Sequence, residues 1–216
     1  MISKEVAVKI PRVLVVGLGG SLAEHSHSLS ALRIALEGAA DSGAETDLFD
    51  LRVLDLPFYR PDARQTPEIA VRMADRIHSA QAMLWSSPMY HGSISGAFKN
   101  ALDWLQLLAR RDPPYLTDKV IGLIATAGGT QGLQAVNAME FIVRSLRGLA
   151  IPLVVPVTHA RQSFDADGVL RDESVRAQLR ALGAEVNRVA GTFSHGIELQ
   201  KECERARERM SEIGSK

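Results

Sequence analysis

The sequence contains a single cysteine, no excess of either charge and no long hydrophobic run. Cys203 alone cannot form an internal disulfide, so a reducing compartment is expected. The 25 basic and 25 acidic side chains balance, which argues against a nucleic-acid-binding surface and against an acidic, solvating tail. No apolar run approaches the roughly 20 residues that span a bilayer, and residues 1–10 are too broken in pattern for a signal peptide. We therefore expect a cytoplasmic globular protein.

The length and composition indicate one folded domain. A chain of 216 residues with 46% hydrophobic content can bury a sizeable core. We divide it into an N-terminal extension (residues 1–10), a domain (11–194) and a charged C-terminal tail (195–216). The tail is dense in Glu, Lys and Arg, and is expected to be a solvated helix or a frayed end.

Short apolar runs alternate with segments of helical periodicity along the domain. This alternation predicts a parallel sheet covered by helices on both faces. Five such units fit a flavodoxin-like three-layer α/β sandwich with strand order 2-1-3-4-5, in which ligands lie at the switch point between strands one and three. The predicted strands are residues 13–17, 45–51, 82–85, 120–126 and 153–157, and the predicted helices are 28–42, 67–80, 96–110, 131–149 and 172–192.

A longer Rossmann sheet of order 3-2-1-4-5-6 is the competing fold. It would need a sixth strand and a glycine fingerprint after the first strand. Residues 17–22 read Gly-Leu-Gly-Gly-Ser-Leu, which places no glycine at the third fingerprint position. The flavodoxin-like order is therefore preferred.

The loop after the first predicted strand combines glycines with serines. Gly20 permits backbone conformations in which N–H groups converge on an anion, and Ser21, Ser26 and Ser28 add hydroxyl donors at the start of the next helix. The alternative interpretation is a serine-rich turn and helix cap that binds nothing. A metal site is not expected, because no nearby carboxylate or cysteine completes a set of metal ligands with His25 and His27.

Two further loops follow the third and fourth predicted strands. Residues 86–104 pass from an apolar strand through a glycine-bearing loop into an amphipathic helix, and residues 125–132 form a second glycine-rich loop. In a parallel sheet, the loops after strands one, three and four meet at one edge. Such an edge suits a flat, anionic cofactor. Each loop alone could instead be a plain turn, and Tyr90 could be a core aromatic residue.

Residues 86–104 resemble the signature Ser-Pro-x-Tyr-x-Gly-Ser-x-x-Gly-x-x-Lys-Asn-x-x-Asp-Trp of the NADPH-dependent FMN reductase family. The loop after the first strand resembles the family pattern Gly-Ser-x-Arg-x-x-Ser-x-Asn, with matches at Gly20, Ser21 and Ser26. It departs from that pattern at Ala23, where the arginine is expected, and at Ser28. Losing the arginine removes a bidentate phosphate partner. Either FMN binds less tightly as a result, or His25 and His27 supply compensating donors. The resemblance covers about residues 11–190.

The resemblance implies a set of cofactor-binding residues on these three loops. None of them is expected to act as an obligatory acid or base, because the flavin performs the redox step. The signature residues Asp103 and Trp104 are expected to serve packing or an interface between subunits. The FMN-binding set is Gly20, Ser21, Ser26, His27, Ser28, Pro88, Met89, Tyr90, His91, Gly92, Ser93, Thr126, Ala127, Gly128 and Gly129.

The implied activity is an NAD(P)H-dependent FMN oxidoreductase that passes hydride from NADPH or NADH through FMN to a flavin, quinone or similar small acceptor. The family commonly forms dimers or tetramers, so a homo-oligomer is expected. Two alternatives remain: an FMN-dependent dehydrogenase or reductase of one small metabolite, and a flavodoxin-type electron carrier. The zero net charge argues against the carrier, because docking to redox partners would lack electrostatic steering.

Overall fold

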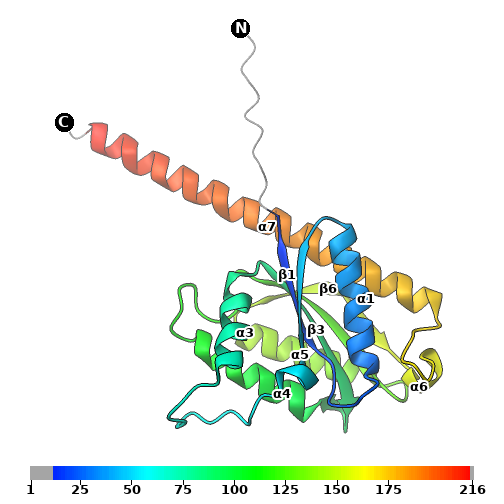
Figure 1. The fold of residues 1–216 in the computed structure, drawn as a ribbon. Coiled ribbons are helices and arrows are strands. Elements are labelled where there is room, and N and C mark those ends of the chain that lie inside the picture. Colours follow the sequence, from blue (N-terminus) through cyan, green and yellow to red (C-terminus); the bar gives the residue numbers. More distant parts are fainter. Residues whose placement is uncertain (1–11, 215–216) are drawn as a thin grey trace.

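The computed structural model describes residues 12–214 and shows a parallel sheet between two layers of helices (Figure 1). The sheet has the strand order β2-β1-β3-β5-β6, with every neighbouring pair on this path parallel. A two-residue strand, β4, adds an antiparallel pair at the end of β3. The predicted flavodoxin-like order is confirmed, and β4 is an addition. The strands are β1 (Leu14–Gly19), β2 (Glu45–Asp50), β3 (Ala82–Tyr90), β4 (Ser93–Ile94), β5 (Val120–Thr126) and β6 (Leu149–Val157).

Helices cover both faces of the sheet (Figure 1). The first face carries α1 (His27–Asp41) and α7 (Glu173–Gly214), and the second carries α3, α4 and α5. The predicted helix over 96–110 is α-helical only to Asp103 and continues as a 3-10 helix, η1, to Leu108. The remaining helices are α2 (Leu51–Leu54), α3 (Glu68–Ser79), α4 (Gly96–Asp103), α5 (Gly132–Ser145) and α6 (Ala160–Ser163).

Helix α7 is longer than its periodicity predicts. The prediction ended near Thr192, but α7 continues without a break to Gly214 and includes most of the charged tail. Glu, Lys and Arg are good helix formers, so charge density does not end the helix. Residues 198–207 are exposed, and this end of α7 projects away from the sheet (Figure 1). Within residues 12–214, no helix has both the length and the apolarity that a membrane crossing needs. The predicted extension, residues 1–10, lies outside the described residues.

Successive side chains of the central strands pack alternately against the two helical layers. On β3, Met83 and Trp85 pack in the layer with α3, α4 and α5, whereas Ala82 and Leu84 pack with α1 and α7. Trp85 meets Phe98 of α4 edge-on, with ring centroids 5.7 Å apart. Burial on both faces explains why this strand reads as a continuous apolar run. The edge strand β2 is only partly buried, which explains its weaker, mixed pattern.

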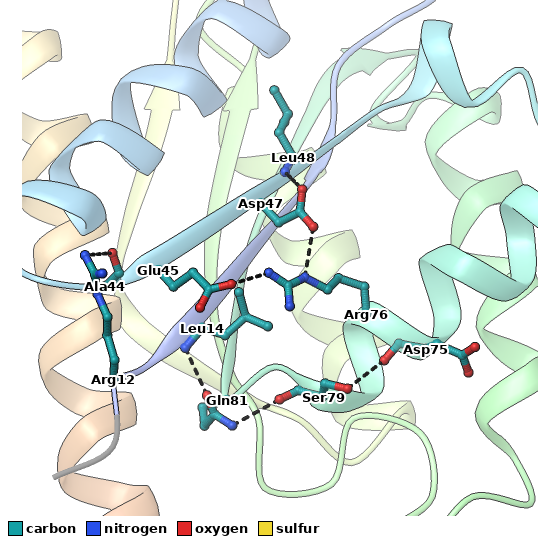
Figure 2. A network of polar contacts seen from close by, with 10 residues as sticks. All are labelled: Arg12, Leu14, Ala44, Glu45, Asp47, Leu48, Asp75, Arg76, Ser79 and Gln81. Atoms are coloured by element: carbon teal, nitrogen blue, oxygen red, sulfur yellow. Dashed lines mark hydrogen bonds and ion pairs between the residues drawn. The ribbon is translucent and has the colours of Figure 1, made fainter. Parts of the chain in front are cut away.

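A network of polar contacts fastens α3 to the edge strand (Figure 2). Arg76 of α3 donates from Nε to a carboxylate oxygen of Asp47 at 2.9 Å and forms an ion pair with Glu45, both on β2. Gln81, after α3, accepts a hydrogen bond from the N–H of Leu14 at 2.9 Å. The exposed pairs contribute about 1 kcal/mol or less each. The two ion pairs join α3 to β2, and the Gln81 hydrogen bond joins the residue before β3 to the start of β1.

Candidate functional site

The carboxyl ends of β1 and β3 approach each other very closely. The N–H of Gly20 donates to the carbonyl oxygen of Ser86 at 3.1 Å. A Cβ atom added at Gly19 would lie 2.1 Å from that same oxygen, so only glycine fits there. The chain then turns away from β1 into the serine loop, residues 20–28, directly beside the end of β3.

The hydroxyl groups of the serine loop form a buried chain. Ser21, Ser26 and Ser28 are 8%, 6% and 1% exposed. The Ser21 hydroxyl donates to the Ser26 oxygen at 3.0 Å, and the Ser26 and Ser28 oxygens lie 3.1 Å apart. Ser26 also caps α1 by accepting from the N–H of Leu29 at 3.2 Å. Part of the alternative interpretation is therefore correct, because Ser26 is a helix cap.

The start of α1 leaves backbone donors beside these hydroxyls. The first N–H groups of a helix have no partner within it, and no hydrogen bond from the N–H of His27 or Ser28 is found among residues 12–214. The positive end of the helix dipole lies at the same place. Clustered hydroxyls and free N–H groups are the donor set that a phosphate accepts from. This part of the structure fits the phosphate end of FMN.

The segment after β3 forms a tight hairpin. His91 and Gly92 both have positive φ angles, 50° and 79°, and link the paired residues Tyr90 and Ser93 of β3 and β4. Two consecutive positive φ angles are typical of a type I′ turn. The Tyr90 side chain is 54% exposed. It lies at the surface of the site, so the alternative that it is a core residue is wrong.

The loop after β5 is tied to the loop after β6. The N–H of Ala127 donates to the carbonyl of Val157, and the N–H of Ala160 donates back to the carbonyl of Ala127, both at 2.9 Å. The N–H of His159 donates to the carbonyl of Gly129 at 3.1 Å. Thr126 and Ala127 are buried, whereas Gly128 and Gly129 are exposed. These bonds hold the glycine-rich backbone at the same edge as the other two loops.

The three loops enclose one open hollow of about 430 Å³. Nine of the fifteen residues predicted to bind FMN line it: Ser21, His27, Ser28, Pro88, Met89, Tyr90, Thr126, Ala127 and Gly128. The other six support the loops without lining the hollow: Gly20, Ser26, His91, Gly92, Ser93 and Gly129. Among the described residues, no aspartate or glutamate lines the hollow, which favours an anionic occupant.

Four lining residues are outside the predicted set: Ala23 and His25 belong to the serine loop, whereas Ala160 and Arg161 lie outside all three predicted loops. Ala160 and Arg161 belong to α6 and follow β6, which ends at the same edge of the sheet as β1, β3 and β5. That parallel arrangement was the available signal, but residues 158–161 contain no glycine to mark them. The pKa of His27 is lowered, first by its partial burial and second by the nearby charge of Arg161.

Two residues of the 86–104 signature hold a neighbouring loop in place. Asn100 accepts from the N–H of Tyr59 at 2.9 Å and donates to the carbonyl of Pro57 at 3.0 Å. The indole N–H of Trp104 donates to the same carbonyl at 2.9 Å, and its side chain is buried within this chain. Trp104 thus has the packing role that was expected. Asp103 forms an ion pair with Lys99 on the same helix.

The comparison with known proteins gives the family. Residues 13–162 match the family described as NADPH-dependent FMN reductase. The chain belongs to this family. Among its relatives, the NAD(P)H-dependent FMN reductase PA1204 of Pseudomonas aeruginosa is 32% identical over 189 residues, which cover 83% of this chain and 98% of that protein. The NAD(P)H:quinone oxidoreductase of Solanum tuberosum is 29% identical over 190 residues, with coverage of 80% and 90%.

Solved structures show the same fold for this FMN reductase. The flavoenzyme FerB, an NAD(P)H:(acceptor) oxidoreductase from Paracoccus denitrificans, superposes with a TM-score of 0.66 at 23% identity, covering 84% of this chain and 98% of that one. A flavodoxin from Streptococcus pneumonia superposes with a TM-score of 0.56 at 13% identity, covering 81% and 97%. The reductase is an NAD(P)H-dependent oxidoreductase with FMN as its cofactor, which confirms the predicted activity class.

Proposed function

We propose that FMN lies in the 430 Å³ hollow with its phosphate on the serine loop. The observation that carries this proposal is the meeting of three loops around one hollow. It has hydroxyl and N–H donors at one end and, in the part of the chain that the structure describes, no lining carboxylate. The hydroxyls of Ser21 and Ser28 and the free N–H groups at the start of α1 would hold the phosphate.

The remaining two loops are proposed to hold the isoalloxazine ring. The backbone of residues 88–92 and 126–129 would supply N–H and carbonyl groups along the ring edge, and Pro88 and Tyr90 would supply apolar contact. The tie between the loops after β5 and β6 fixes the width of the hollow. FMN held there would supply the redox chemistry, which is hydride transfer from the nicotinamide and electron transfer to a second substrate.

We propose that the acceptor is a small planar molecule such as a flavin or a quinone, which replaces the nicotinamide at one open site. The exposed Tyr90 at the surface of the site would contact either substrate. The relatives named for quinone and FMN reduction support this substrate class. We further propose a homodimer or homotetramer in the cytoplasm. The exposed apolar side chains of Leu22, Phe58 and Leu133, on segments next to the site, support an interface there.

The first test is a visible absorption spectrum of the purified protein, followed anaerobically after adding NADPH and then NADH. Flavin bands that bleach within seconds are the expected result, and the faster donor is the preferred one. Bands that persist with both donors would overturn the reductase activity in favour of a carrier or a metabolite-specific enzyme. Protein that takes up no FMN would overturn the proposed site.

A pair of variants on α1 tests the position of the phosphate. Ser28→Ala removes a buried hydroxyl of the hollow, and Ser30→Ala removes a hydroxyl two residues further along that does not line it. A hydrogen bond to a charged group contributes about 1.5–3 kcal/mol, so Ser28→Ala should weaken FMN binding about tenfold or more. Ser30→Ala should leave the FMN dissociation constant unchanged. Equal effects of the two substitutions would contradict the placement.

A further inference from the structure

Arg161 lines the same hollow as Ala23, the position at which the family motif has an arginine. It follows β6, and Ser21 and Ser28 line this hollow too. Among the described residues, Arg161 is the one lysine or arginine that lines the hollow.

The backbone that carries Arg161 is held by contacts with the loop after β5 and with the start of α1. The N–H of Ala160 donates to the carbonyl of Ala127 at 2.9 Å. Phe164, at the end of α6, is 3% exposed, and its ring stacks on that of His27 with centroids 4.6 Å apart and planes 8° apart. The Ala160 hydrogen bond before Arg161 and the stacking of Phe164 on His27 after it fix the Arg161 backbone relative to the start of α1.

The guanidinium group of Arg161 is available to a ligand. No ion pair or side-chain hydrogen bond of Arg161 is found among residues 12–214. The nearby Asp165 contacts Arg171 instead, at 3.9 Å. The charge of Arg161 reaches the serine loop, since it contributes to lowering the pKa of His27 after the larger effect of burial. Among residues 12–214, the lining of the hollow thus includes an unpaired cation and no carboxylate.

We propose that Arg161 is the cationic partner of the FMN phosphate, replacing from the loop after β6 the arginine that is missing at Ala23. This inference rests on the proposed placement of FMN. A guanidinium group matches two phosphate oxygens at once. Hydrogen bonds to a charged group have a strength that corresponds to about a ten- to hundredfold change in affinity. The serine hydroxyls and N–H groups would orient the phosphate, and Arg161 would neutralise its charge.

The test compares FMN with riboflavin, which lacks the phosphate. Dissociation constants of both are measured by flavin fluorescence on apoprotein, for the wild type, Arg161→Gln and the control Arg171→Gln. Arg171 lies on the same segment, its side chain is 70% exposed and it does not line the hollow. Arg161→Gln should weaken FMN about ten- to hundredfold and riboflavin less than twofold. It should also reduce the dependence of FMN binding on salt. Arg171→Gln should change neither flavin.

A second pair of variants separates a lost charge from a damaged fold. Arg161→Lys keeps the charge and should weaken FMN less than Arg161→Gln. Adding Ala23→Arg to Arg161→Gln should restore at least part of the FMN affinity. Unchanged FMN binding in Arg161→Gln, or an equal loss for FMN and riboflavin, would overturn the inference. Wild-type apoprotein that binds riboflavin and FMN equally well would also overturn it, whereas wild type that binds neither would overturn the proposed function itself.

Discussion

Replacing Gly183 by alanine tests the contact that positions α1. Gly183 lies on α7 where this helix crosses α1, and an added Cβ atom would lie 1.8 Å from the carbonyl oxygen of Ala35 and 2.7 Å from the N atom of Ala39. Both are backbone atoms, so no side-chain rotation can relieve the clash. The two helices must separate by roughly 1 Å or more to reach normal van der Waals distances.

The magnitude follows from two opposing effects. Alanine is the better helix former by about 1 kcal/mol, but overpacking a well-packed contact costs about 1–3 kcal/mol or more. The separation would also loosen the layer in which Leu32 of α1 packs with Leu182 and Val186 of α7. Because the clash is with backbone, the larger overpacking value applies. We expect Gly183→Ala to lower the free energy of unfolding by about 2 kcal/mol.

Gly196→Ala is the matched control, because it makes the same substitution in the same helix. An added Cβ at Gly196 would meet nothing within 4 Å. This variant should therefore be as stable as the wild type or more stable by up to about 1 kcal/mol. Urea unfolding of the apoprotein, followed by far-UV circular dichroism, measures both variants. A Gly183→Ala protein at least as stable as the wild type would refute the reasoning.

Two further predictions concern Lys119, which directly precedes β5, and the charged tail. The amine of Lys119 donates to two backbone carbonyls, and burial lowers its pKa from 10.5 to about 8. Between about pH 8 and 10.5, the Lys119 amine binds its proton more tightly in the unfolded chain than in the folded protein. The free energy of unfolding of the wild type, measured with urea, should therefore rise relative to that of Lys119→Met over this pH range. A pH-independent difference between the two proteins would contradict this. Truncation after Gln200 should change the free energy of unfolding by less than about 1 kcal/mol, because residues 201–207 are exposed. A loss of several kcal/mol would show that the tail packs on the domain.

The sequence predicts most of the sheet because strands that are buried on both faces consist almost entirely of apolar residues. β3 and β5 are buried on both faces and read as apolar runs, and the alternation of strands with helices then favours one parallel order. The β4 strand was missed because two residues carry no periodicity. The full length of α7 was missed because a helix that projects into solvent needs no apolar face, so its amphipathic pattern fades while the helix continues.

The three predicted loops lie together because their glycines and serines mark places where the backbone must turn sharply or donate to an anion. The loop after β6 has no such mark. Its contribution depends on the stacking of Phe164 on His27 and on the backbone bond between Ala160 and Ala127. These contacts join residues that are distant in the sequence, so local composition cannot reveal them. The sequence around Arg161 therefore does not distinguish it from an arginine on the protein surface.

The geometry of a parallel sheet explains why the arginine that pairs with the phosphate could come from a different loop than in the family motif. The strands β1, β3, β5 and β6 all end at one edge, so a long side chain on any of the following loops reaches the same hollow. The hydroxyl and N–H donors must stay on the serine loop, because they depend on the start of α1. The guanidinium group lies at the end of a long side chain, so it can reach two phosphate oxygens from any of these loops. Under the proposed role of Arg161, Ala23 in place of the motif arginine is thus no evidence of lost FMN affinity, because Arg161 lines the same hollow.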